Sequence, residues 1–376
     1  MIIGTIKEIS DNEKRVAITP ETCKKFISLG YEVLLEKDSG KQSNYSDEEY
    51  IKAGAVVINS ITELLPKVDI LLTVSSILEN DYLELLKDNA IFIGMFNPYE
   101  SFKSLSKIVQ KKFSLITLDF LPRISRAQAM DVLSSQANLA GYKAVIEASS
   151  IYRKAFPMMM TAAGTIVPAK CLILGAGVAG LQAIATAKRL GCIVSAFDVR
   201  PEVEEQVNSL GATFVKVQDI SSDNNQKDSV YAKEMTQEYK LKQYEKIHEV
   251  AIQSDIIITT ALIPGKKAPL LIRRNTIKEM KGGSVIIDMS GINGGNVEGM
   301  EFDKKIVYEN INIYAPANIP SLISADASLL YSKNIFNFIE TFTTDNNFDI
   351  EVDDELVTDS IIIKNGTKTD NFFEVK

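Results

Sequence analysis

The chain has 376 residues, of which 45% are apolar and 24% charged, and its formal net charge is -8. This length exceeds what one hydrophobic core usually supports, so two domains are expected. The acidic balance argues against nucleic-acid binding, which needs a basic face. The three cysteines show no CxxC spacing, so neither a disulfide framework nor a metal site is expected.

The chain shows no targeting or membrane-spanning pattern. Its first residues, "MIIGTIKEIS", lack a basic segment followed by a long apolar core, so no signal peptide is predicted. No run of about 18 uninterrupted apolar residues is present, and hence no spanning helix is predicted. We expect a reducing, cytoplasmic compartment, and any attachment to a membrane would come through a partner.

Short β-branched runs alternate with helical stretches along most of the chain. A first series of strands runs from "MIIGTIKE" to "FSLITLDF", and a second runs from "KCLILGAG" to "INIYAPA". Such alternation predicts α/β units with mainly parallel sheets. The fold expected is therefore two doubly wound α/β domains, joined by long helices.

The stretch 125–155 between the two series contains good helix formers and few breakers. It predicts a long helix crossing between the domains, with Ser125 as its N-cap. The stretch "AFPMMMTAAGTIVPA" that follows is interpreted as a connector, with Met158 to Met160 as packing residues. The chain's last long helix is expected to return to the first domain, and "IIIKNGTKT" predicts a β-hairpin. The first domain would comprise residues 1–133 and 327–376, and the second 134–326.

The most specific local pattern is a glycine-rich loop. Gly175, Gly177 and Gly180 form G-x-G-x-x-G directly after the strand "CLIL" and before the helix "LQAIATAKRLG". The first glycine allows a tight turn, the second lets a pyrophosphate approach, and the third permits close helix packing. Asp198 ends the next strand, where an acid can hydrogen-bond ribose hydroxyls. Together these features predict a Rossmann-like dinucleotide site.

Two charged residues bear on which dinucleotide binds. Asp198 would repel a 2′-phosphate and favours NAD, whereas Arg200 could hold that phosphate, which leaves NADP as the alternative. His248 is the only histidine and is interpreted as a partly packed helix residue. A dehydrogenase that oxidises an alcohol or amine commonly uses a histidine or lysine as its proton carrier. No other histidine is present for that role.

Several long motifs resemble one family. "RISRAQAMDVLSSQANLAGYKAVI", "FPMMMTAAGTIVPAKCLILGAGVAGLQAIATAKRLG", "FDVRPEVEEQVNSLGA", "YAKEMTQEY" and "TTALIPGKKAPLL" are similar to the NAD(H)-binding part of the proton-translocating transhydrogenases. "KEISDNEKRVAITPE" is shared with the related alanine dehydrogenases. The resemblance spans nearly the whole chain and is to the separately encoded first part of the α subunit.

The resemblance implies an activity and partners. In that family the soluble part passes hydride from NADH to NADP(H) bound on a β subunit, and the exchange is coupled to proton movement. The implied partners are two membrane subunits, the second part of the α subunit and the β subunit, and the soluble part would be a homodimer. It would be held peripherally at the cytoplasmic membrane through those subunits.

The resemblance also implies roles for single residues in the segment "RISRAQAMD" and just after it. Arg123 would donate to the phosphates, and Asp131 would fix the ribose hydroxyls or the carboxamide. Gln128 would lie near the nicotinamide, with Ser134 a weaker candidate beside it. Tyr231 lies in a segment matching a mobile loop that closes over the site. The segments that resemble nucleotide-contacting ones contain Val178, Val199, Gln243 and Leu262.

The chain departs from both groups at informative positions. Alanine dehydrogenases use a lysine that aligns with Thr73, a histidine near Phe96 and an aspartate near Ile292. Without these groups a stand-alone amino-acid dehydrogenase, the main alternative, has no evident proton carrier, and Arg15 is expected to be structural. A non-catalytic NAD(H)-sensing module is the third hypothesis. Val230 stands where a glycine is expected in the mobile loop.

Overall fold

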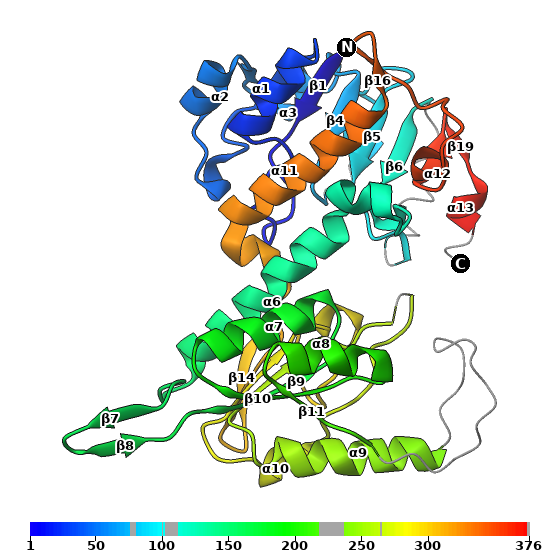
Figure 1. Ribbon diagram of the computed structural model, residues 1–376. Coiled ribbons are helices and arrows are strands. Elements are labelled where there is room, and N and C mark those ends of the chain that lie inside the picture. Colours follow the sequence, from blue (N-terminus) through cyan, green and yellow to red (C-terminus); the bar gives the residue numbers. More distant parts are fainter. Residues whose placement is uncertain (76–79, 100, 102–111, 218–236, 264, 374–376) are drawn as a thin grey trace. The chain divides into compact units, whose positions relative to one another are not determined.

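The computed structural model describes residues 1–75, 80–99, 101, 112–217, 237–263 and 265–373 (Figure 1). They form two compact units, one of residues 1–136 with 320–376 and one of residues 137–319. We call these unit 1 and unit 2. Both are built on a mainly parallel sheet, so the predicted fold class is confirmed.

The sheet of unit 1 is eight-stranded, in the order β19-β18-β6-β5-β4-β1-β2-β3. Neighbours are parallel from β3 through β6, while β18 is antiparallel to β6 and to β19. The turn between β18 and β19 is the predicted "NG" turn, with positive φ at Asn365 and Gly366. The strands are β1 (Ile2–Thr5), β2 (Glu32–Glu36), β3 (Val56–Ile58), β4 (Ile70–Leu72), β5 (Ile91–Gly94), β6 (Ser114–Thr117), β18 (Ile361–Lys364) and β19 (Thr367–Lys368).

Helices complete unit 1 on both faces of this sheet. Alternate residues of one strand belong to different cores: Val33 packs in the cluster that holds α11, and Leu34 in the opposite cluster. The cluster on the α11 side includes Phe338 and Ile339, both fully buried. The α-helices are α1 (Pro20–Ser28), α2 (Asp47–Ala53), α3 (Ile61–Leu64), α4 (Asn80–Leu83), α11 (Ser324–Thr341), α12 (Glu355–Thr358) and α13 (Asp370–Phe373). The 3₁₀ helices are η1 (Lys41–Ser43), η2 (Leu118–Phe120), η3 (Ser125–Met130) and η6 (Pro320–Ile323), and β16 (Thr343–Thr344) pairs with β17 (Asn347–Phe348).

The sheet of unit 2 is seven-stranded, in the order β11-β10-β9-β12-β13-β15-β14. Its neighbours are parallel except β14 and β15. The chain moves outward from β9 through β10 to β11, then crosses back to β12 on the other side of β9. In such sheets the crevice beyond the carboxyl ends of the two central strands is the usual ligand site. The strands are β9 (Lys170–Leu174), β10 (Ile193–Phe197), β11 (Thr213–Phe214), β12 (Ile256–Thr259), β13 (Val285–Asp288), β14 (Lys305–Tyr308) and β15 (Ile311–Tyr314).

The remaining elements of unit 2 are helices and one projecting hairpin. The helices are α7 (Val178–Arg189), α8 (Glu204–Ser209), α9 (Gln237–Ala251), α10 (Arg274–Glu279), η4 (Pro201–Val203) and η5 (Gly291–Asn293). The hairpin pairs β7 (Met159–Thr161) with β8 (Gly164–Ile166), as Figure 1 shows. The interpretation of Met158 to Met160 as packing residues is therefore wrong for the isolated chain, since Met160 is 78% exposed. No helix among the described residues is long and apolar enough to span a bilayer.

The long helix α6 (Val132–Ile151) begins later than predicted. Residues from Ser125 to Met130 form the 3₁₀ helix η3 instead, so Ser125 is the first residue of that short helix and not the N-cap of α6. Asp131 takes the capping role, because its carboxylate accepts the backbone N–H of Ser134 at 2.8 Å. An aspartate carboxylate can satisfy a free N–H at a helix start as well as a serine can. The predicted N-cap at Ser125 is wrong for this reason.

Candidate functional site

The glycine-rich loop of unit 2 is shaped by steric limits at two of its glycines. Gly175 has φ +104°, a conformation that residues with a Cβ rarely adopt. A Cβ on Gly180 would lie 1.9 Å from the carbonyl oxygen of Gly175, so only glycine lets α7 pack this closely on the turn. Thr260 braces the same turn, because its hydroxyl donates to the Gly175 carbonyl at 3.2 Å. The loop therefore has one well-defined backbone path.

Gly177 serves a different purpose in the same loop. A Cβ there would meet nothing closer than the Arg200 guanidinium at 3.9 Å, so packing does not require glycine. Gly177 is the N-cap of α7 and has no side chain with which to cap the helix. The start of α7 thus offers backbone N–H donors and a positive dipole end without a side chain in front. This arrangement fits the pyrophosphate of a dinucleotide.

Asp198 lies at the carboxyl end of β10 beside this loop. Its carboxylate accepts the Ala176 N–H at 2.7 Å and the Arg200 N–H at 2.9 Å. The Arg200 guanidinium also reaches it, with Nε 3.0 Å from Oδ1. Burial alone would raise the pKa of Asp198, but the Arg200 side chain and the two N–H groups lower it overall. The carboxylate is therefore ionised and held facing the loop.

The other residues predicted to bind cofactor in unit 2 divide into two groups. Val178, Val199 and Leu262 follow β9, β10 and β12 closely, and all three side chains are exposed. They offer apolar surface at the carboxyl edge where a ligand would lie. Gln243 is half-buried on α9, and the hydroxyl of the next residue, Tyr244, hydrogen-bonds to α10. The predicted loop residues Tyr231 and Val230 lie outside the described residues.

A buried polar centre that the sequence did not reveal supports the same edge. The Asn296 amide accepts the Ala261 N–H at 3.2 Å and donates to the carbonyls of Ala261 and Pro269 at 3.0 and 2.7 Å. The Asp288 carboxylate accepts the Asn296 N–H at 2.7 Å. These bonds fix the loop that contains Leu262. No motif marked Asn296, because its partners come from separate loops.

In unit 1, the segment from Arg123 to Ser134 places several predicted residues along η3 and the start of α6. We call this the clamp segment. Arg123 and Gln128 are exposed, so their side chains are available to a ligand. Arg126, which lies in the same motif but was given no role, forms a bidentate pair with Asp354 at 2.6 and 2.8 Å.

Asp131 and Ser134 contact each other within the clamp segment. The Ser134 hydroxyl donates to Asp131 Oδ2 at 2.6 Å, in addition to the backbone bond that caps α6. The pair is only half-buried. Asp131 therefore has a structural role whether or not it also contacts a nucleotide, and a test of its function has to keep the cap intact.

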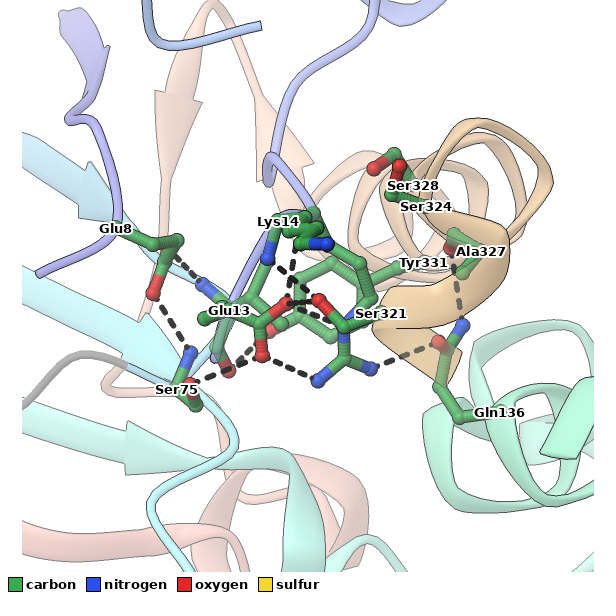
Figure 2. Close-up of polar contacts among 12 residues, drawn as sticks. Glu8, Glu13, Lys14, Ser75, Gln136, Ser321, Ser324, Ala327, Ser328 and Tyr331 are labelled. Carbon is green, nitrogen blue, oxygen red and sulfur yellow. Dashed lines mark hydrogen bonds and ion pairs between the residues drawn. The ribbon is translucent and has the colours of Figure 1, made fainter. Parts of the chain in front are cut away.

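Arg15 lies in a buried polar network of unit 1. Figure 2 shows two of its partners, Glu13 and Gln136. Its guanidinium donates to Glu13 through Nε at 2.7 Å and Nη2 at 2.6 Å, and to Gln136 through Nη1 at 2.8 Å. Burial alone would lower the pKa of Arg15, but the Glu13 carboxylate raises it overall. The cation is thus bound by acceptors from its own chain, in agreement with the structural role expected for it.

Among the described residues, the end of β4 beside this network carries Thr73 and Ser75 rather than a lysine. Ser75 donates its hydroxyl to Glu13 at 3.2 Å, whereas Thr73, the position aligned with a lysine, is buried and accepts the Tyr331 hydroxyl through its carbonyl. Phe96, near which the dehydrogenase histidine would fall, is buried against Phe92, with ring centroids 4.8 Å apart.

Two positions in unit 2 also bear on proton transfer. Ile292, near which the dehydrogenase aspartate would fall, has no titratable group and is exposed on η5. His248 is on α9 and hydrogen-bonds Thr276 of α10 at 2.9 Å, which fits its interpretation as a partly packed helix residue.

Fold and loop together define a class: a two-unit α/β protein with a glycine-rich phosphate-type loop at the switch point of a parallel sheet. Comparisons with known proteins narrow this class. Models described as the N-terminal and C-terminal domains of "Alanine dehydrogenase/PNT" match residues 4–140 and 144–371.

Whole-chain relatives agree with these matches. The first part of NAD(P) transhydrogenase subunit alpha from Rickettsia prowazekii is 46% identical over 369 residues, which cover 97% of this chain and 95% of that protein. The Rhodospirillum rubrum protein of the same name is 41% identical over 372 residues, 97% of each chain. A solved transhydrogenase structure from Sinorhizobium meliloti is 42% identical, covers 98% of this chain and 100% of that chain, and has a TM-score of 0.88. The chain belongs to the alanine dehydrogenase/PNT family and, within it, to the proteins that form the first part of transhydrogenase subunit alpha, which confirms the resemblance.

Proposed function

We propose that this chain is the NAD(H)-binding subunit of a proton-translocating transhydrogenase. It passes hydride from NADH directly to NADP bound on a β subunit, and it is active only with its partner subunits. The observation that carries the proposal is the start of α7, where Gly177 leaves the backbone N–H groups without a capping side chain. It lies in a chain that matches a transhydrogenase α-subunit protein over 97% of its length. The packing of the loop explains Gly175 and Gly180, and the approach of a dinucleotide pyrophosphate explains the third glycine, Gly177.

In this proposal unit 2 holds most of the cofactor. The backbone at Gly175, Gly177 and Gly180 receives the pyrophosphate, and Asp198 accepts the adenosine ribose hydroxyls. Because Asp198 is ionised and already engages Arg200, a 2′-phosphate is disfavoured and the bound nucleotide is NAD(H). The side chains that line the cofactor are those of Val178, Val199, Arg200, Gln243 and Leu262.

The clamp segment handles the nicotinamide end. The nicotinamide itself supplies the hydride, so the protein has to orient the ring and exclude water rather than move a proton. Gln128 and Asp131 orient the carboxamide and ribose, Arg123 donates to a phosphate, and Ser134 supports Asp131. Tyr231, on the segment assigned to closure, completes the set.

The partners are two membrane subunits, the second part of the α subunit and the β subunit, which also carry out proton translocation. The relatives are named as only a first part of subunit alpha, which supports a division into further subunits. We place the chain in the cytoplasm, attached peripherally to the inner membrane through these partners.

We propose a homodimer in which the β7–β8 hairpin packs on a second copy. Met158, Met160 and Val167 are 59%, 78% and 76% exposed on or beside this two-stranded hairpin. An isolated two-stranded hairpin is marginally stable in water, and exposed apolar patches commonly mark protein interfaces. Met160→Lys should convert the dimer to a monomer in light scattering. An unchanged dimer would remove the hairpin from the interface.

Reconstitution tests the proposal. The purified chain is combined with the two transhydrogenase membrane subunits in vesicles, and reduction of an NAD analogue by NADPH is followed. We expect exchange only when all subunits are present. NADH binding without exchange would instead indicate the NAD(H)-sensing module.

The amino-acid dehydrogenase alternative has its own test. The purified chain is supplied with NAD and alanine, lysine or saccharopine, and NADH production is measured. We expect no turnover, because Arg15 is bound to Glu13 and Gln136 and the neighbouring strand end offers Ser75. Clear NADH production would overturn the assignment.

A further inference from the structure

One buried amide of α11 hydrogen-bonds to the chain on both sides of Asp131, in the clamp segment and just after it. Asn334 donates through Nδ2 to the carbonyl of Ala129 at 2.8 Å and accepts the Ser135 hydroxyl through Oδ1 at 2.7 Å. Ala129 belongs to η3 and Ser135 to the first turn of α6, so the two contacts lie on either side of Asp131. A single planar group thus spans the turn that carries Asp131, and one of its bonds is to the residue next to Gln128.

The Asn334 amide projects from α11, a helix that is fixed by packing in the core of unit 1. Asn334 is only 8% exposed, and its neighbour Ile335 is fully buried in the core of unit 1. One turn earlier, the Tyr331 hydroxyl donates to the Thr73 carbonyl at 2.7 Å and fixes α11 to the end of β4. A short side chain on a fixed helix has little freedom, so the distance between its two partners is tightly set. Functional groups need placement within about 0.5 Å by such supporting residues.

We propose that Asn334 is a positioning residue for hydride transfer. It acts through Ala129 and Ser135 and sets the spacing between η3 and α6, and thereby the direction of the Gln128 and Asp131 side chains. It does not itself contact the nucleotide. The inference rests on the proposed function, because it assumes that the clamp segment orients the nicotinamide.

Asn337 provides a matched control on the same helix. Its Nδ2 donates to the same Ala129 carbonyl at 2.9 Å, but its side chain is partly exposed. This bond reaches η3, whereas Asn334 bonds both η3 and, through Ser135, α6. Loss of Asn337 therefore removes one hydrogen bond to the clamp segment and leaves the turn connected.

The test compares Asn334→Ala, Asn334→Asp and Asn337→Ala in the reconstituted complex. We expect Asn334→Ala to lower the exchange kcat about tenfold or more, because small misplacements of reacting groups cost large factors in rate. NADH affinity, measured on the chain alone, should change less than threefold. The fluorescence of bound NADH should shift toward that of free NADH. Asn337→Ala should stay within twofold of the wild-type chain in all three measurements.

Asn334→Asp and one further variant, Ser135→Ala, keep the inference falsifiable if Asn334→Ala does not fold. Asn334→Asp retains an acceptor for Ser135 but sets a carboxylate oxygen against the Ala129 carbonyl, a repulsion that the remaining Asn337 bond does not relieve. Ser135→Ala removes the other contact. Each should lower kcat by a similar factor, and the double variant should lower it no further than the larger single effect. Folded variants with unchanged kcat and fluorescence would overturn the positioning role alone. A wild-type chain that binds NADH but shows no exchange would overturn the proposed function as well.

Discussion

The glycine-rich loop of unit 2 and the clamp segment of unit 1 obtain their shapes in different ways. In the loop, Gly175 and Gly180 fix the backbone because no larger residue fits, and the partners lie within a few positions or on the adjoining strand. In the clamp segment, the polar side chains of Arg123 and Gln128 are exposed, and the turn is held from α11.

This difference predicts which property a substitution in each region would change. A change at Gly175 or Gly180 acts through steric overlap and should weaken binding together with stability. A change in the clamp segment acts through orientation and should slow hydride transfer while binding and stability persist. The predictions that follow test this separation.

The largest effect is expected for Gly180→Ala. The added methyl would lie 1.9 Å from the Gly175 carbonyl oxygen, so the backbone must move, at a cost of about 1–3 kcal/mol or more. Calorimetry and NADH titration should show a lower melting temperature and a loss of affinity of about a hundredfold. Gly177→Ala is the control: its melting temperature should be unchanged, while the methyl obstructs the pyrophosphate. Equal behaviour of the two variants would contradict the roles assigned to the glycines.

Asp131→Asn and Gln128→Asn should slow exchange about tenfold to a hundredfold with little change in NADH affinity. Asparagine still caps a helix, so Asp131→Asn removes the charge and keeps the start of α6 intact. Asp131→Ala should also cost about 1 kcal/mol of stability, because the cap is lost. Stopped-flow exchange rates and equilibrium titrations separate the two effects. Folded variants with unchanged exchange would remove both residues from the clamp.

Asp198→Ala should weaken NADH binding about tenfold to a hundredfold, since a hydrogen bond to a charged group contributes about 1.5–3 kcal/mol. It also releases Arg200, whose Nε now lies 3.0 Å from the carboxylate. Binding of NADPH to the variant should therefore improve relative to NADH. Arg200→Ala in the same background should abolish that improvement. Calorimetric titration with both nucleotides measures the preference, and an unchanged ratio would contradict the pairing.

The smallest effect concerns pH. The folded-state pKa of Asp198 is lowered, so its contribution to stability is full above the ordinary value of about 3.9 and is lost as pH falls through the folded value. The free energy of unfolding in urea should differ between the wild-type chain and Arg200→Ala by about 1 kcal/mol or less. That difference should be constant from about pH 8 to 5 and shrink only below about pH 4. A difference that disappears between pH 8 and 5 would contradict the assignment.

How far the sequence was informative follows from the same contrast. The alternation of strands and helices, the glycine loop and the "NG" hairpin were all predictable, because local sterics determine them. The start of α6 was not, since Asp131 and Ser125 are both good caps and tertiary contacts decide between them. Asn334 lies 205 positions from Ala129, and no local pattern reports such a contact.

The β7–β8 hairpin illustrates the same limit. Its methionines have the composition of core residues, yet Met160 is 78% exposed on the single chain. An apolar run indicates a surface that is commonly covered, but not whether the same chain or another one covers it.

The limits of the nucleotide-binding domain, predicted as 134–326, remain a prediction.

The central claim is direct hydride transfer without a proton carrier from this chain. It is tested most directly with NADH deuterated at the transferred position of nicotinamide C4, in the complex reconstituted with the membrane subunits and NADP in ordinary water. We predict that the deuterium appears undiluted in NADPH. Deuterium released to the solvent, or NADPH carrying hydrogen from water, would contradict the account.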